Sequence, residues 1–429
     1  MPIIRFPFSV HLLTTATSLL ITVSFLSLEA QSPDPALDHA RQLLRAAPLI
    51  DGHNDLPWEI RTSKTAPRDV AAYDLRGRAP GHTDLARLRQ GQVGAQFWSV
   101  YIPGEVGDSG YARVQLEQID IARRMIARYP EDLTLALTAD ELTRAFKRGR
   151  IASLLGMEGG HAIENSLGAL RDYYALGVRY MTLTHNVTLD WADAALDSAR
   201  HGGLTEFGRE VVREMNRLGM LVDLSHVSPG VMSDALDVAE APVIFSHSGA
   251  RAVVEHVRNV PDSILARLPR NGGVVMVVFY PPFVSTEVAQ WDWSLKAAQA
   301  EIASGTADSA ERERRSAEWL AAHPAPRATL AQVADHIEHV RAVAGSDHVG
   351  IGSDFDGMEY VPVGLEDVST FPALFAELIR RGWSDADLKK LANGNLLRVL
   401  HAAEATAARL QRTWEPSIRT IEEMDGSGR

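Results

Sequence analysis

The sequence predicts an α/β fold, a (β/α)8 barrel of the TIM type with a helical insertion after the seventh strand. Eight apolar runs of the length of buried parallel strands recur along the 429-residue chain, with helical patterns between them. Such alternation implies a parallel sheet covered by helices. Five of the runs end in His, Asp or Glu, which is typical of the carboxyl edge of a barrel, where polar side chains from successive strands meet. An open, doubly wound sheet is the alternative.

The predicted strands follow one another at intervals that leave room for a helix. Their ranges are 48–52, 93–100, 151–157, 179–184, 219–224, 242–247, 272–279 and 348–353. Helical spacing of apolar residues is seen between them at 111–129, 205–218 and 229–239. The last of these begins with Ser228 and Pro229, an N-cap residue followed by proline at the first helical position. Residues 291–326 are rich in Ala, Glu and Arg and end in prolines, so we expect a solvated helical insertion there.

Composition excludes several classes of partner and site. With 45% hydrophobic and 23% charged residues, the chain resembles a globular protein with a large core. Its net charge of −12 argues against a nucleic-acid partner, because no basic stripe is present to displace counterions from phosphates. The absence of cysteine excludes disulfides, thiolate zinc sites and a lipoprotein anchor.

The N-terminal residues indicate export. Arg5 precedes an uncharged, apolar stretch from Ser9 to Leu28, and polar sequence follows Ala30. This layout predicts a signal peptide over residues 1–30, with residues 31–429 forming one catalytic barrel domain. An uncleaved membrane anchor is the alternative, because about 20 apolar residues can span a bilayer. The polar residues 422–429 argue against a lipid anchor attached through a hydrophobic tail, so we expect no stable membrane insertion after cleavage.

The first two polar signatures suit metal binding. His53 and Asp55 are two residues apart, so at the end of an extended strand both side chains point to one face and can chelate one cation. A structural histidine with a capping aspartate would give the same pattern. Glu158 lies between glycines at positions 156, 159 and 160, which leave its carboxylate uncrowded and able to bridge two metals. A surface glutamate in a glycine turn is the simpler alternative.

Two histidines complete the predicted cluster. His226 and His247 each end an apolar run, and they are one strand–helix unit apart, so neighbouring strands would place them side by side. A single histidine at such a position is more often a hydrogen-bonded core residue. Because five strand ends in succession carry ligand-type residues, however, the pattern as a whole favours a metal-dependent hydrolase.

Several ordered motifs resemble a known family. They occur at residues 50–58, 158–161, 180–186, 223–226, 245–248, 258–262, 353–357 and 364–368. Through these motifs, the sequence from about residue 44 to 398 resembles the membrane (renal-type) dipeptidases and their bacterial relatives, the M19 peptidases. The resemblance implies a (β/α)8 barrel enzyme with two zinc ions that hydrolyses dipeptides.

The resemblance also implies a role for each metal ligand. His53 and Asp55 would bind one zinc ion, and His226 and His247 would bind the second, with Glu158 bridging both. Two zinc ions sharing a water would lower its pKa, so that metal-bridged hydroxide attacks the scissile carbonyl at neutral pH.

Three further residues are implied in substrate binding and catalysis. His185 would face the substrate carbonyl and stabilise the oxyanion, Arg258 would pair with the terminal carboxylate, and Asp354 would meet the free amino group. The leaving amine would take its proton from Asp354 or from the bridging Glu158, and the sequence leaves that choice open. Because this clamp recognises the two termini, we expect tolerance of a D-residue at the C-terminal position.

Two other functions share some of these features. A barrel hydrolase acting on phosphotriesters or cyclic amides typically has His-x-His on its first strand and a carbamylated lysine as bridge, where this chain has Asp55 and Glu158. A non-catalytic binding protein would be expected to have lost ligands. Mammalian members of the family carry disulfides, a lipid anchor and a shorter segment at 291–326. We therefore expect a bacterial, periplasmic enzyme, and the sequence leaves a homodimer open.

Overall fold

The computed structural model describes residues 34–105 and 110–426, and the unit from Pro35 onward contains all the secondary structure described below. The strands are β1 (Leu49–Asn54), β2 (Val93–Ser99), β3 (Leu133–Leu135), β4 (Ile151–Glu158), β5 (Val178–Thr182), β6 (Leu221–Asp223), β7 (Ile244–Ser248), β8 (Val274–Val277) and β9 (Val349–Ile351). The predicted signal peptide lies outside the described residues.

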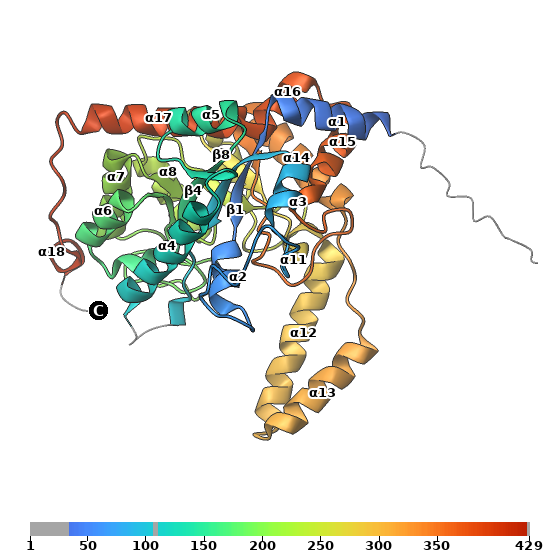
Figure 1. The fold of residues 1–429 in the computed structure, drawn as a ribbon. Coiled ribbons are helices and arrows are strands. Elements are labelled where there is room, and N and C mark those ends of the chain that lie inside the picture. The colour runs from blue at the N-terminus through green and yellow to red at the C-terminus, as the bar shows by residue number, and fades with distance from the viewer. Residues whose placement is uncertain (1–33, 106–109, 427–429) are drawn as a thin grey trace, which may run out of the picture. The chain divides into compact units, whose positions relative to one another are not determined.

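The helices alternate with these strands and surround them (Figure 1). In chain order they are α1 (Pro35–Ala46), α2 (Leu56–Thr62), α3 (Leu85–Gln90), α4 (Tyr111–Arg128), α5 (Ala139–Lys147), α6 (Leu167–Ala175), α7 (Glu206–Leu218), α8 (Pro229–Val238), α9 (Asp262–Leu265), α10 (Leu268–Asn271), α11 (Pro281–Val284), α12 (Thr286–Gly305), α13 (Ser309–Ala322), α14 (Leu330–Ala344), α15 (Phe371–Arg380), α16 (Asp385–Lys389), α17 (Asn395–Leu410) and α18 (Ile421–Asp425). The predicted cap is confirmed, because the Ser228 side chain accepts a hydrogen bond from Val231 N at the start of α8.

The strands form a closed parallel barrel, as predicted. Neighbours pair in the order β2-β1-β9-β8-β7-β6-β5-β4, and pairing of β2 with β4 closes the ring. Each of the eight predicted apolar runs overlaps one barrel strand. The extra strand β3 was not predicted, because three residues are too few to show a pattern. It pairs with the first residues of β4, whereas β5 pairs with the last, so β3 extends one edge without interrupting the barrel.

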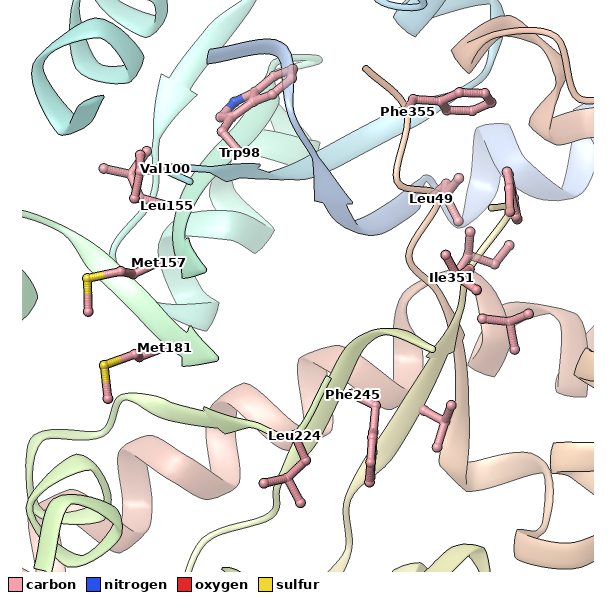
Figure 2. Close-up of a cluster of buried hydrophobic side chains, with 14 of the residues drawn as sticks. Leu49, Trp98, Val100, Leu155, Met157, Met181, Leu224, Phe245, Ile351 and Phe355 are labelled. Carbon is pink, nitrogen blue, oxygen red and sulfur yellow. The ribbon is translucent and has the colours of Figure 1, made fainter. Parts of the chain in front are cut away.

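Side-chain alternation along β4 shows how the barrel directs residues inward. Leu155 and Met157 belong to the large cluster that also contains helix residues, and Figure 2 shows Met157 there with Met181 of β5. Leu154 belongs to a second cluster that includes inward-facing residues of other strands. Successive strand residues point to opposite faces. Glu158 is four positions after Leu154, so its side chain points to the same face, the inside of the barrel, at the carboxyl end of β4.

The helical insertion after the seventh barrel strand is also confirmed. Helices α12 and α13 follow β8 and α11, and they form a hairpin that extends away from the barrel in Figure 1. The insertion begins at Thr286, earlier than the predicted 291, because Ser285 caps α12 by accepting a hydrogen bond from Val288 N. Helix α13 has no buried residue, which agrees with its charged sequence. Within the described residues, none of the helices combines the length and the apolar character needed to span a membrane.

Candidate metal centre and active site

The five predicted metal ligands meet at the carboxyl end of the barrel. His53 lies in β1, Asp55 follows that strand, Glu158 ends β4, His226 follows β6, and His247 lies in β7. All five are buried, although His53 and His247 are 194 positions apart in the sequence. Barrel closure therefore brings together residues that the sequence separates widely.

Glu158 lies between the two groups of ligands. Its Oε2 atom is 3.5 Å from His53 Nε2, and its Oε1 atom is 3.0 Å from His226 Nε2 and 3.5 Å from His247 Nε2. Ser99 donates a hydrogen bond of 3.1 Å to Oε2 and so fixes the orientation of the carboxylate. Each oxygen thus faces a different group of ligand nitrogens, as a bridging carboxylate requires.

The donor set fits divalent metal ions. Within the part of the chain that the structure describes, buried His53 Nε2 and Asp55 Oδ1 have no hydrogen-bond partner, although His53 Nε2 lies 3.2 Å from Asp55 Oδ2. Unpartnered buried polar atoms are costly unless another group satisfies them. Among residues 34–105 and 110–426, groups of three ligand atoms within 4.8 Å of one another occur twice around Glu158, with His53 and His247 and with His185 and His226. Imidazole and carboxylate together are ligands that zinc accepts.

Hydrogen bonds orient the rings of the two later histidines. The Nδ1 atom of His226 lies 3.0 Å from Asn186 Oδ1, and that of His247 lies 2.9 Å from Ser246 Oγ. An amide oxygen can only accept, so His226 carries its proton on Nδ1. Ser246 Oγ donates to Asp223 Oδ2 at 2.6 Å, so it accepts from His247 Nδ1. Both rings therefore present an unprotonated Nε2 to the centre, which is the form that binds a metal.

His53 is held from behind by a tyrosine. Its Nδ1 atom is 2.8 Å from Tyr180 Oη, and both side chains are fully buried. Gly156 makes room for this contact, because a Cβ atom at that position would lie 2.0 Å from Tyr180 Cζ. Gly156, two residues before Glu158 on β4, thus supports His53, a predicted ligand on β1.

Backbone conformation at the centre is unusual. His226, Asp354 and Asp356 have φ values of +68°, +68° and +66°, in the left-handed region that non-glycine residues seldom adopt. Such residues cost on the order of 1 kcal/mol or more each and gather at functional sites. At His226 the turn is stabilised by Asp223 Oδ1, which accepts hydrogen bonds from Ser225 N and Ser246 N.

Burial and nearby charges set the protonation of the ligands. Burial lowers the pKa of His226 and His247 well below the usual histidine range, so both are neutral at pH 7. Burial acts in the same direction on His53, but Tyr180, Asp55 and Glu158 outweigh it and raise the pKa of His53 well above normal. The side of the centre around His53 therefore attracts positive charge, which suits a cation.

The centre opens into a pocket of about 380 Å³. Arg258 lines it and is almost fully buried, with Nη2 3.0 Å from His247 Nε2. Its Nε and Nη1 atoms have no hydrogen-bond partner among the described residues. Burial lowers the pKa of Arg258 to about 10, so the guanidinium stays charged at neutral pH. Two free donors on a buried cation are suited to a carboxylate.

His185 and Asp354 line the same pocket, as the sequence implied. His185 Nε2 is 3.9 Å from Glu158 Oε1, which places it close enough to be a further metal ligand as well as a contact for substrate. Asp354 Oδ1 is 4.0 Å from His53 Nε2. Burial raises the pKa of Asp354 well above its usual value, and the neighbouring Asp55 and Glu158 carboxylates add to the rise.

Sequence reasoning missed several residues that line this pocket. Tyr280 directly follows the seventh apolar run, so the strand-end pattern could have identified it. Asp292 and Lys296 reach the pocket from α12, and they form a salt bridge of 2.7 Å. No sequence signal separated these two from the other charged residues of the insertion.

Comparison with known proteins identifies the family. The model of the membrane dipeptidase family, peptidase family M19, matches residues 37–413. Dipeptidase 3 of Mus musculus is 43% identical over 377 residues, which cover 86% of this chain and 68% of the mouse protein. The chain belongs to the M19 membrane dipeptidase family.

Solved structures of two proteins support the same conclusion. The probable dipeptidase PvdM from Pseudomonas aeruginosa has 26% identity and a TM-score of 0.76, covering 88% of this chain and 100% of that one. A metallopeptidase of family M19, dipeptidase AC, has 26% identity and a TM-score of 0.68, covering 83% of this chain and 98% of its own. As a member of this family, the protein is a metallo-dipeptidase.

Proposed function

We propose that this M19 dipeptidase uses two zinc ions to hydrolyse free dipeptides, including those with a D-residue at the C-terminal position. The position of Glu158 is the main support for two ions and not one. Its two oxygens face different groups, with His53 on one side and His226 and His247 on the other. A single-ion site would not need a buried carboxylate between two sets of nitrogens.

In this proposal His53 and Asp55 hold one ion, His226 and His247 hold the other, and Glu158 is shared. When bound, the two ions would lower the pKa of a water towards neutrality and so supply hydroxide as the nucleophile. Tyr180 supports this arrangement from behind by orienting the His53 ring.

The remaining residues bind and orient the dipeptide. Arg258 offers its free Nε and Nη1 donors to the substrate carboxylate. Asp354 lies near the His53 side of the pocket, where it can accept a hydrogen bond from the substrate ammonium. His185 lines the pocket and donates to the carbonyl oxygen as negative charge develops there. A clamp of this kind contacts only the two termini of the dipeptide. It therefore does not discriminate between L- and D-configuration at the second residue.

Asp354 is the better candidate to protonate the leaving amine. Both oxygens of Glu158 face histidine nitrogens, and Oε2 also accepts from Ser99. Asp354 lines the pocket with Oδ1 4.0 Å from His53 Nε2, beyond hydrogen-bond distance, so its carboxyl group can exchange a proton with substrate.

Purified protein tests the proposal. We expect two zinc ions per chain and hydrolysis of L-L and L-D dipeptides, with little turnover of tripeptides or N-acetyl dipeptides, because either change leaves a buried charge unpaired. One ion or none after incubation with zinc would reject the binuclear centre. Equal turnover of dipeptides, tripeptides and N-acetyl dipeptides would reject the clamp while leaving peptidase activity intact.

The cellular location remains part of the proposal. The uncharged stretch from Ser9 to Leu28 supports cleavage after residue 30 and a periplasmic enzyme, with residues 31–429 as the catalytic domain. Expression of the full chain in a Gram-negative host should give mature protein that begins near Gln31 in the periplasmic fraction. Retention of the first 30 residues in the membrane fraction would favour an uncleaved anchor.

A further inference from the structure

A second cavity lies beside the active-site pocket and is larger than it, with a volume of about 630 Å³ compared with about 380 Å³. It is enclosed by the beginning of α12, the returning segment 325–328 after α13, and the loop 357–361. The helical insertion therefore builds one of its walls.

Apolar side chains form most of this cavity. Val288, Trp291 and Leu295 face it from α12, and Met358 and Val361 face it from the loop. Val288 and Met358 are only 6% exposed and form the buried part of the cavity, whereas Tyr360, which is 64% exposed, lies at its opening. The charged side chains Arg327 and Glu359 that also border the cavity are exposed, which places them at its rim.

Hydrogen bonds fix the walls. Trp291 Nε1 donates to His323 O at 2.8 Å and ties the start of α12 to the end of α13. Val363 N donates to Ala328 O at 2.8 Å, and Leu330 N donates to Val363 O at 2.9 Å, so the returning segment is joined to the loop. A cavity held in this way is preformed, and filling it costs little ordering of the protein.

The cavity and the active-site pocket share a wall. Tyr280, Asp292 and Gly357 line both. Asp292 is paired with Lys296 at 2.7 Å, so its charge is compensated where the two spaces adjoin and opposes an apolar group there less than a free carboxylate would.

Gly357 shows which end of the substrate lies next to the cavity. A Cβ atom at Gly357 would lie 2.3 Å from Asp55 Oδ2 and 2.6 Å from Asp354 Oδ1. The shared wall is thus beside Asp354, the proposed partner of the substrate ammonium. The ammonium and the first side chain of a dipeptide are attached to the same Cα atom, so that side chain is the group nearest to the cavity.

We propose that this second cavity binds the side chain of the substrate's N-terminal residue and selects large apolar groups such as Leu and Phe. The proposal rests on the dipeptidase function proposed above. Burial of such a side chain should raise kcat/KM for Phe-Ala and Leu-Ala over Ala-Ala by about 10- to 100-fold. The reversed dipeptides, Ala-Phe and Ala-Leu, should show a much smaller preference.

A pair of matched variants tests the location of the side-chain site. Leu295→Trp should fill the cavity and lower the Phe-Ala to Ala-Ala ratio of kcat/KM at least fivefold, with zinc content close to that of the unmodified enzyme. Leu320→Trp makes the same change on α13, at a 41% exposed residue outside the cavity lining, and should leave the ratio unchanged. Leu295→Ala, which enlarges the cavity, should lower the ratio by a smaller amount and serves if the tryptophan variant fails to fold.

Other outcomes would overturn the proposal. Equal kcat/KM for Phe-Ala, Leu-Ala and Ala-Ala in the unmodified enzyme would do so, as would a preference confined to the C-terminal residue. An unchanged ratio in both Leu295 variants would place the selective site elsewhere. Failure to hydrolyse any dipeptide would instead reject the proposed function, and with it this inference, so the two failures are distinguishable.

Discussion

Replacement of Arg258 by methionine tests how the dipeptide carboxylate is recognised. Arg258 is 2% exposed, and two of its donor atoms lack a hydrogen-bond partner in the described ranges 34–105 and 110–426. Methionine approximates the volume of the arginine stem but offers no donor and no charge. The variant therefore removes the proposed carboxylate contact, and with it the cation–π contact of the guanidinium with Phe283, whose ring centre is 5.2 Å from Arg258 Cζ.

The size of the effect follows from burial. Loss of one partner of a buried, hydrogen-bonded charge pair costs about 2–5 kcal/mol, which corresponds to a loss of at least about 30-fold in kcat/KM for a free dipeptide. The same substitution should not destabilise the free protein, because a buried cation with unpartnered donors is replaced by an apolar side chain. We expect the free energy of unfolding of Arg258→Met to be unchanged or higher by about 1 kcal/mol.

A cycle of two enzymes and two substrates isolates the contact. The unmodified enzyme should prefer a dipeptide to its C-terminal amide by at least about 30-fold, and Arg258→Met should turn over the two at similar rates. Zinc content and urea unfolding of both proteins show whether the centre and the fold are retained. If the preference for the free carboxylate persists in a folded, zinc-loaded Arg258→Met enzyme, Arg258 does not bind that carboxylate.

Three further predictions concern the ligands and a buried histidine. His185→Ala should lower kcat by about 10²- to 10³-fold with zinc retained, whereas loss of zinc would make His185 a ligand. Glu158→Ala should reduce the binding of both zinc ions and His53→Ala mainly that of one, as measured by elemental analysis; equal losses would contradict a bridging Glu158. Burial lowers the pKa of His336 to about 4, below its value of about 6.5 in the unfolded chain. Between these two pH values the unfolded chain binds a proton at this residue and the folded protein does not. The free energy of unfolding should therefore fall by about 3 kcal/mol as the pH decreases from 6.5 to 4. His336→Asn, which can still accept the hydrogen bond from Ala250 N, should weaken that decrease in urea titrations, and an identical pH dependence would show that His336 does not cause it.

The barrel was predictable because its signals are local. Each strand is buried on both faces and therefore forms a short apolar run, and the chain after it forms an amphipathic helix. The positions of His53, Glu158 and His247 followed from the same rule, since the carboxyl ends of all strands in a barrel meet at one face. Strand β3 was missed because Leu133–Leu135 is too short to produce a period.

The sequence alone showed which residue types stand at the strand ends. From those residue types it predicted a metal-dependent hydrolase. Only the tertiary structure decided how those residues are used: that the two oxygens of Glu158 face different histidines, and that Asn186 and Ser246 set the protonation of the rings. The same holds for Asp292, which reaches the pocket from the insertion. These arrangements depend on distances between segments far apart in the chain. Closure of the barrel sets those distances, so they cannot be predicted from the pattern of residues within any one segment.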